Sequence, residues 1–477
     1  MKRYYAFDRG IFQPQALENV AIHTNPVEKD REHSPMFTEG YFAQPSLPWE
    51  VRYDNAYPNV IYDEEAQLYR LYYTLIIYDP ESSRYTRQER AKRNYIPKHD
   101  RRTATGYAES KDGIHWTKPN LGIVEFQGSK DNNLIMLSAH GTGVMLDKEE
   151  LNPKRRYKMM LMLDVVGVES RMAVSFSADG IHWEEPIVWP KYTARGDSHN
   201  FVFRDRRDGK YKVITRIWRN NLRLSALSES TDFINWSEPK EILRGWGWES
   251  QVYSMPVFPM GDMYLGLASM FHEGDRTAPD FDTVDCELTY ATKLDVFDFV
   301  DPGASFIPRG EGHYPDGEFD CCCIYSAAPV EIDGKLCFYY MGGNGQHTNY
   351  RETSFGRAFL EKDKFAYMSQ RNPENPGKLV SAAVHFFGDT FRILCDKEPD
   401  GSLEIQLVSS WTEEQGLEGY TFRDCRMTKE PDGWYRVTFA KALGDFPPEQ
   451  KVSIVARLKG CKVYAMEGDF AATSINY

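Results

Sequence analysis

The chain lacks long apolar runs, and none of its hydrophobic stretches approaches the roughly 20 residues that a membrane-spanning helix needs. Its opening residues, MKRYYAFDRG, also lack the apolar core of a signal peptide. These absences predict a cytoplasmic protein with no membrane partner.

Positive charge is in short supply, because 57 Lys and Arg face 70 Asp and Glu, for a formal net charge of −13. A nucleic-acid-binding domain usually carries a basic surface, so we expect no nucleic-acid partner. The single basic run spans residues 84–102. We interpret it as a solvated loop or a contact between subunits, which leaves a homo-oligomer open.

Cysteine is also sparse, with eight residues scattered along 477 positions except for the triplet Cys321, Cys322 and Cys323. Neighbours on a strand face opposite ways, so the triplet alone does not build a zinc cage. We interpret all eight cysteines as reduced thiols and predict no metal site. Phosphate-binding loops, dinucleotide fingerprints, HExxH and nucleophile-elbow motifs are missing, so we expect no cofactor.

Helical patterns with caps are scarce, whereas one turn motif recurs through most of the chain. Its copies are SKDGIHWTKP (110–119), SADGIHWEEP (177–186), STDFINWSEP (230–239) and the divergent KLDVFDFVDP (293–302). Segments around these copies repeat a strand, a polar turn and a second strand, five times in all. Five repeated units of about four strands predict a five-bladed β-propeller over residues 45–370.

The flanking segments complete an all-β fold. We expect residues 1–44 to pack on the propeller, and RNPENPGK (371–378) to act as a linker because it is rich in Pro, Asn and Gly. Residues 379–477 alternate apolar and polar positions in short strands, which predicts a β-sandwich.

The first strand of each propeller blade borders a shared central channel, so polar residues beside those strands are the candidate site. Acidic residues recur there, and Asp54, Asp197 and Glu249 are the predicted catalytic group. Each one alone is more often a turn residue, and the recurrence supports the functional interpretation. Clustered carboxylates shift one another's pKa values, which allows an acid beside a base or nucleophile. The predicted substrate-binding residues are Arg52, Asn55, His140, His199, Asn200, Trp248, Gln251, Tyr253, Asp320 and His347.

Several motifs resemble glycoside hydrolase families 32 and 43, namely YDNAYPNVIYDEE, the DGIHW repeats, DSHNFVFRD and FGRAFLEKDKFAYMSQ. The resemblance implies an exo-acting glycosidase for a small glycan or oligosaccharide, for example one ending in a furanose such as fructose or arabinose. It implies that Asp54 is the nucleophile or general base. The chain departs from family 32 at Tyr53-Asp54-Asn55-Ala56, where Asn-Asp-Pro-Asn is characteristic. Asp197 as stabiliser and Glu249 as general acid are therefore assigned from strand phase.

Two other functions stay open. A non-catalytic carbohydrate-binding propeller would bind glycans without turnover, although clustered carboxylates bring little to a pure binder. A glycoside phosphorylase on a similar scaffold would need a cationic phosphate site.

Overall fold

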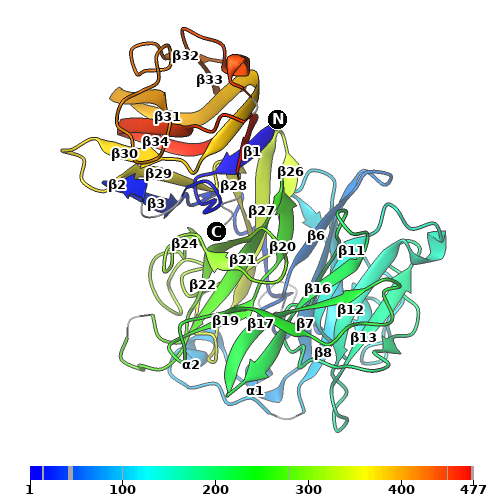
Figure 1. The fold of residues 1–477 in the computed structure, drawn as a ribbon. Coiled ribbons are helices and arrows are strands. Elements are labelled where there is room, and N and C mark those ends of the chain that lie inside the picture. Colours follow the sequence, from blue (N-terminus) through cyan, green and yellow to red (C-terminus); the bar gives the residue numbers. More distant parts are fainter. Residues whose placement is uncertain (13–15, 41–46, 99, 279, 448, 474–477) are drawn as a thin grey trace. The chain divides into compact units, whose positions relative to one another are not determined.

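The computed structural model describes residues 1–12, 16–40, 47–98, 100–278, 280–447 and 449–473 (Figure 1). Strands dominate them, which confirms the all-β expectation. The described residues have only short helical segments, among them α1 (Pro80–Ser83), α2 (Arg87–Arg90), η3 (Pro153–Arg155) and η4 (Leu443–Asp445). None of these has the length and apolarity that crossing a bilayer requires.

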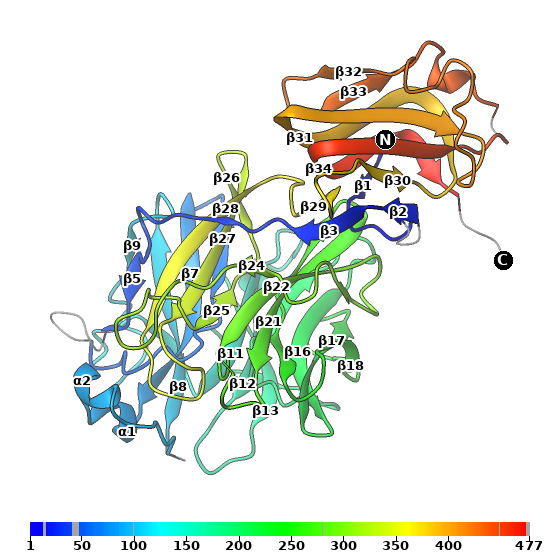
Figure 2. The same ribbon diagram turned by 90° about the vertical axis from the view of Figure 1, so that its left-hand side faces the viewer.

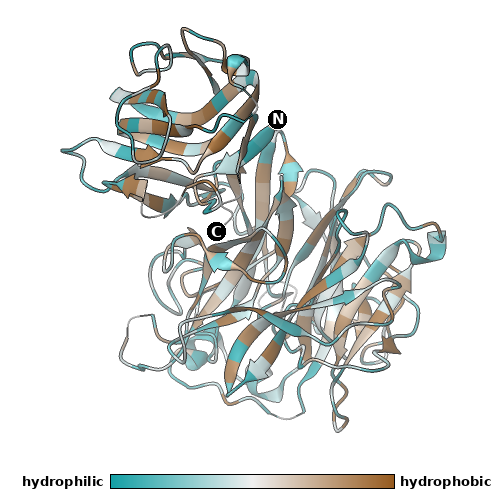
Figure 3. Ribbon diagram, viewed as in Figure 1, coloured by the Kyte–Doolittle hydropathy of each residue, from teal (hydrophilic) through white to brown (hydrophobic). Residues whose placement is uncertain are grey.

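The chain divides into two compact units. The larger one comprises Val27–Phe299 and Ser305–Leu360, and the smaller one Met1–Pro26, Val300–Ala304 and Glu361–Tyr477. Strands of both units carry alternating apolar and polar bands, as expected for strands with one buried face (Figure 3).

The first three sheets of the larger unit follow one another along the chain and are antiparallel (Figure 2). The first contains β6 (Asn59–Asp63), β7 (Leu68–Tyr78), β8 (Arg102–Ser110), β9 (Trp116–Thr117) and β10 (Leu134–Leu137). The second contains β11 (Ala139–Leu146), β12 (Tyr157–Leu163), β13 (Arg171–Ser177) and β14 (Ile187–Val188). The third contains β15 (Phe201–Arg204), β16 (Tyr211–Arg219), β17 (Leu222–Ser230) and β18 (Lys240–Arg244).

A 12-stranded sheet completes the unit and consists of two antiparallel groups joined by one parallel pairing, Val284 with Cys323. The fourth group contains β19 (Ser250–Ser254), β20 (Val257–Met260), β21 (Met263–His272), β22 (Val284–Ala291), β23 (Asp298–Phe299) and β24 (Ser305–Ile307). The fifth contains β25 (Cys323–Ser326), β26 (Val330–Ile332), β27 (Lys335–Gly343), β28 (Thr353–Glu361), β4 (Glu28–Lys29) and β5 (Phe37–Thr38).

Each of these five groups packs against the next one along the chain. β11 lies against β6 and β7, β15 against β11, and β19 against β17. The fifth group returns to the first, since β26 lies against β6 and Tyr339 Oη donates a hydrogen bond to the Gly113 carbonyl. Apolar cores fill the spaces between neighbouring groups, so each sheet is stabilised by the sheets on either side.

The repeated turn has the same hydrogen bonds in three copies. In the second copy, Asp179 Oδ1 accepts from the backbone N–H groups of Ile181 and His182, and Ser177 Oγ accepts from Gly180 N–H. Burial would raise the pKa of Asp179, but hydrogen bonds from His182 and from the backbone outweigh burial and lower the pKa to about 2. Ser and Asp keep the same spacing in the three copies because their side chains replace missing backbone acceptors, and the third copy has Phe233 where the first two have glycine.

One nine-stranded sheet forms the smaller unit, and its two long strands pair over most of their length. These strands are β31 (Val384–Val408) and β34 (Ser453–Ala472). The others are β1 (Lys2–Tyr5), β2 (Leu17–Glu18), β3 (Val20–Thr24), β29 (Ala366–Gln370), β30 (Gly377–Val380), β32 (Arg426–Lys429) and β33 (Tyr435–Thr438). Register shifts interrupt the long pair, and a single core contains side chains from either side of them, such as Ile393 and Ile405.

The unit boundaries differ from the expected ones. Residues 1–26 were expected on the propeller, but β1 pairs with β34, β2 with β30 and β3 with β29. The smaller unit also begins at Glu361, before the expected linker at 371–378, because β29 joins its sheet. Only residues 27–40 of the described N-terminal segment belong to the larger unit, where β4 and β5 pair with β28. The unit boundaries are set by strand pairing between segments that are distant in the sequence, and local sequence patterns do not predict such pairing.

Substituting Gly180 should test the packing between the first two sheets. Gly180 and Gly209 share similar positive φ angles, 77° and 72°, so alanine at either position has a similar backbone cost of about 1 kcal/mol. A Cβ at Gly180 would lie 2.5 Å from Tyr72 Oη, whereas a Cβ at Gly209 would meet nothing within 4 Å. We expect Gly180→Ala to lower the free energy of unfolding by about 1–3 kcal/mol more than Gly209→Ala. Denaturant titration measures both, and equal losses would contradict the packing account.

Candidate functional site

Tyr57 is the point at which the five strand groups meet. Its ring centroid lies 5.8 Å from His140, 5.9 Å from His199 and 6.2 Å from Tyr325, and its hydroxyl lies 3.4 Å from Tyr253 Oη. Those four partners belong to the second, third, fifth and fourth groups. Residues from all five groups therefore lie close together around Tyr57, although they are far apart in the sequence.

Asp54 lies beside this meeting point and is held by arginine. Arg351 Nη2 donates to Asp54 Oδ1 at 2.8 Å and to Asn55 Oδ1 at 2.6 Å, and Arg52 Nη2 lies 3.5 Å from Asp54 Oδ1. Burial would raise the pKa of Asp54, but Arg351, Arg52 and Arg101 outweigh it and hold the pKa well below the usual range. Asp54 is therefore an ionised carboxylate, and its 22% exposed side chain remains accessible.

A second carboxylate, Asp197, lies beside the same meeting point. Tyr57 and the residues around it are called the centre below. Arg216 Nη2 lies 2.6 Å from Asp197 Oδ1, and the Tyr57 hydroxyl is 3.4 Å from the Asp197 carbonyl. Arg216 outweighs the effect of burial and lowers the pKa of Asp197. The Asp197 side chain is 42% exposed while that of Arg216 is 3% exposed, so the carboxylate faces solvent and the guanidinium supports it.

Three predicted histidines also surround the centre, all in their neutral form. Burial lowers the pKa of His140, although Asp164, Asp197 and Asp54 oppose it, and burial lowers the pKa of His199 to about 3. Burial and Arg351 lower the pKa of His347. Neutral imidazoles exchange hydrogen bonds with hydroxyl groups but carry no charge.

His199 and Asn200 connect strand groups through their hydrogen bonds. His199 Nε2 lies 3.0 Å from Asn59 Oδ1 of the first group, whereas His347 Nδ1 lies 2.6 Å from Tyr325 Oη within the fifth group. Asn200 is buried and donates to the Gly141 carbonyl while accepting from Thr215 Oγ1. Asn200 thus fixes the third group to the second.

The fourth group contributes Tyr253 and Gln251. Asn55 Nδ2 donates to Tyr253 Oη at 3.1 Å, which places Tyr253 within the centre. Gln251 is buried, where it accepts from Arg223 and donates to Glu273 at 3.0 Å.

Glu249 and Trp248 are both exposed, and Glu249 is joined to Glu273 through a backbone hydrogen bond. Asp320 is buried elsewhere in the fifth group, where its carboxylate bonds Lys29 Nζ at 2.6 Å and Tyr340 Oη at 2.8 Å. Asp320 therefore forms a structural ion pair with Lys29.

Several residues of the centre were missed by reasoning from the sequence. They are Tyr57, Arg101, Arg216, Arg223, Glu273 and Arg351. Arg351 follows the glycine-rich GGNGQHTNY segment, which was a usable signal of a loop near the centre. Arg216 and Arg223 lie inside strands, where nothing local distinguishes them from ordinary strand residues.

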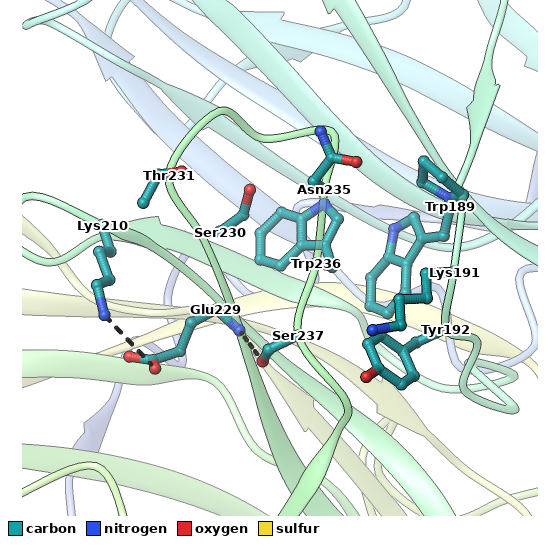
Figure 4. Close-up of a pocket in the computed structure, with 11 residues that line it drawn as sticks. Trp189, Lys191, Tyr192, Lys210, Glu229, Ser230, Thr231, Asn235, Trp236 and Ser237 are labelled. Atoms are coloured by element: carbon teal, nitrogen blue, oxygen red, sulfur yellow. Dashed lines mark hydrogen bonds and ion pairs between the residues drawn. The ribbon is translucent and has the colours of Figure 1, made fainter.

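A separate pocket of about 390 Å³ lies beside the third group (Figure 4). Trp189 and Trp236 stack with centroids 5.5 Å apart, but both are only 5% exposed. The one carboxylate in its lining, Glu229, is paired with lysines. This pocket holds none of the predicted site residues and no free carboxylate, so it is a packing feature between sheets.

In comparisons with known proteins, no family model and no curated protein matches the chain. Similar solved structures include an N-acetylgalactosamine deacetylase from F. plautii in complex with blood group B trisaccharide. It is 15% identical with a TM-score of 0.45, over 72% of this chain and 96% of that chain. Another represents the GH130 family of mannoside phosphorylases, which contains glycoside hydrolases that target β-1,2 mannosidic linkages in Candida mannan. It is 15% identical with a TM-score of 0.46, over 72% and 95%.

A glycosyl hydrolase from Bacteroides ovatus is 14% identical with a TM-score of 0.45, over 71% of this chain and 94% of that chain. The similar structures are thus glycoside hydrolase-like proteins and a carbohydrate deacetylase.

Glu39 is fully buried next to the centre. It connects the segment before Asp54 with the segment after Arg351. Its Oε1 accepts from Tyr53 N–H at 3.0 Å and from Thr353 N–H at 3.1 Å, and Thr353 Oγ1 donates to the Asp54 carbonyl at 2.7 Å. Burial, with Glu352 nearby, raises the pKa of Glu39 to about 7, while Arg90 and Arg52 oppose the rise. Glu39 therefore positions Asp54 and Arg351 through backbone hydrogen bonds.

We expect Glu39→Gln to change how stability depends on pH. The folded pKa of Glu39 is higher than the unfolded value of about 4.3, so its protonated form favours the folded state. The contribution of protonated Glu39 to the free energy of unfolding is complete below pH 4. It is lost as the pH rises to about 7, by at most about 1.4 kcal/mol per pH unit. Glutamine keeps an acceptor oxygen and does not titrate, so the variant should gain stability relative to wild type across this window. Urea unfolding from pH 4 to 8 measures this, with the exposed Glu32→Gln as control. A constant difference would contradict the assignment.

Proposed function

We propose that the larger unit is a five-bladed β-propeller and that it works as an exo-acting glycosidase on a small glycan or oligosaccharide. The five strand groups would be the blades, and the smaller unit would be a β-sandwich formed by one folded sheet. The proposal includes the resemblance to glycoside hydrolase families 32 and 43, with a terminal furanose as the substrate class.

The observation that carries the proposal is the pair of accessible, ionised carboxylates, Asp54 and Asp197, beside the meeting point at Tyr57. Glycoside hydrolysis develops positive charge on the sugar ring, and ionised carboxylates stabilise that charge or attack it. The neutral His140 and His347 are only partly buried and would supply hydrogen-bonding groups suited to sugar hydroxyls, whereas Asn55 and His199 are buried and bonded to protein groups. Asp54 would be the nucleophile or general base, and Asp197 the stabiliser.

The first test uses Asp54→Asn and a panel of aryl glycosides that includes fructosides and arabinosides. Asparagine keeps the shape but loses the charge, so kcat should fall by about 10³-fold or more. Arg351 retains Asn55 Oδ1 as a partner, and circular dichroism should confirm the fold. Asp131→Asn, at an exposed turn, is the matched control and should keep full activity. Full activity in Asp54→Asn would refute the role of Asp54.

The general acid is tested by comparing Glu249→Gln with Glu273→Gln. Glu249 is the predicted acid, whereas Glu273 is the carboxylate bonded to Gln251 and Arg223. An acid is needed for poor leaving groups and dispensable for activated ones. Glu249→Gln should lower kcat/KM on alkyl glycosides by about 100-fold and leave dinitrophenyl glycosides nearly unchanged. The same pattern in Glu273→Gln alone would transfer the role to Glu273.

A glycoside phosphorylase is the second candidate, and the arginine residues around Asp54 favour it. A phosphorylase uses phosphate in place of water as the attacking group, so turnover would depend strictly on phosphate. A non-catalytic glycan-binding propeller would show binding without turnover under either condition.

A further inference from the structure

Three guanidinium groups surround one carboxylate at the centre. Arg351 lies 2.8 Å and Arg52 lies 3.5 Å from Asp54 Oδ1. Arg52 and Arg101 also share Tyr95, since the Arg52 guanidinium lies 4.3 Å from the ring centroid and Arg101 Nη1 lies 3.5 Å from Tyr95 Oη. Arg101 is therefore a close neighbour of the Asp54–Arg52 pair.

Positive charge at this place exceeds negative charge. Among the described residues, Arg101 has no carboxylate within ion-pair distance, and Asp54 is shared by Arg351 and Arg52. The nearby Asp79 is occupied, because it accepts from Ser82 Oγ, Tyr95 Oη and two backbone N–H groups. Even when the Asp79 carboxylate is counted, the three arginines carry one more positive charge than Asp54 and Asp79 carry negative charge.

Hydrogen-bond donors are left over as well. In the part of the chain that the structure describes, Arg52 Nε and Nη1 are buried and have no acceptor. The Arg52 side chain is only 3% exposed, so water does not replace the missing partner freely. The Tyr95 ring offers a π face to Arg52 but no acceptor atom. A buried donor without a partner is destabilising, and a bound acceptor would remove that cost.

We propose that Arg52, Arg101 and Arg351 form a subsite beside Asp54 for an oxyanion, either a carboxylate on the sugar or free phosphate. Arg101 is partly exposed and would contact the anion, while Arg52 would supply its unused donors and Arg351 the buried charge. Guanidinium groups bind carboxylate and phosphate through charge-assisted hydrogen bonds. The inference deepens the proposed function and rests on it, because it adds an anionic ligand to the same site.

Binding without turnover tests the subsite independently of catalysis. Isothermal titration at constant ionic strength would use inorganic phosphate, glucuronate and neutral glucose as probes. At least one anion should bind, and Arg101→Gln should weaken that binding about tenfold or more. Arg102→Gln is the matched control, because Arg102 is exposed on β8 over the Tyr78 ring, and it should leave affinity unchanged. Asp54→Asn should tighten anion binding, because it removes a negative charge from among the arginines.

The outcomes distinguish a carboxylate on the sugar from free phosphate. They also distinguish the anion subsite from the proposed enzyme activity. Binding of glucuronate without phosphate places the anion on the sugar, and binding of phosphate supports a phosphate co-substrate. Absence of binding by both anions, or equal losses in Arg101→Gln and Arg102→Gln, would overturn the subsite. If anions bind in this pattern while no glycoside is cleaved with or without phosphate, the subsite stands and the proposed enzyme activity fails.

Discussion

The centre depends on the ion pair between the buried guanidinium of Arg351 and the carboxylate of Asp54. The guanidinium has no exposed surface, and it joins Asp54, Asn55 and the His347 carbonyl, which belong to the first and fifth strand groups. A buried charge is tolerated only when it is paired and hydrogen-bonded. The pair holds the Asp54 carboxylate ionised, on a residue whose backbone is left-handed with φ of 57°.

The surrounding scaffold explains how such a centre is sustained. Hairpins closed by Asp-containing turns build each strand group, and apolar cores between neighbouring groups hold them together. Tyr57 contacts all four other groups at once, so its aromatic ring serves as a common packing surface. Of the polar residues beside Tyr57, Asp54 and Asp197 keep partly exposed side chains, while Asn55, His199 and Arg351 are buried.

Charge distinguishes the centre from the pocket beside Trp189 and Trp236. The whole chain is acidic, yet arginines gather around Asp54 and Asp197, while the pocket beside Trp189 and Trp236 has its only carboxylate neutralised. Strong fields and accessible ionised groups are typical of functional sites, whereas stacked indoles with little exposure are typical of packing. The function is therefore sought at Asp54 and Asp197.

The sequence by itself determined the all-β class, the repeated Asp-containing turn and the recurrence of polar residues before successive first strands. These follow from short-range patterns, because turn geometry and strand alternation are local properties. It also pointed to Asp54, Asp197, Tyr253 and the three histidines that meet at the centre. Only the tertiary structure decided that Asp320 is a structural ion pair, that residues 1–26 join the smaller unit, and that Arg216 and Arg351 belong to the centre. Those features depend on pairings between residues far apart in the chain, which no local pattern encodes.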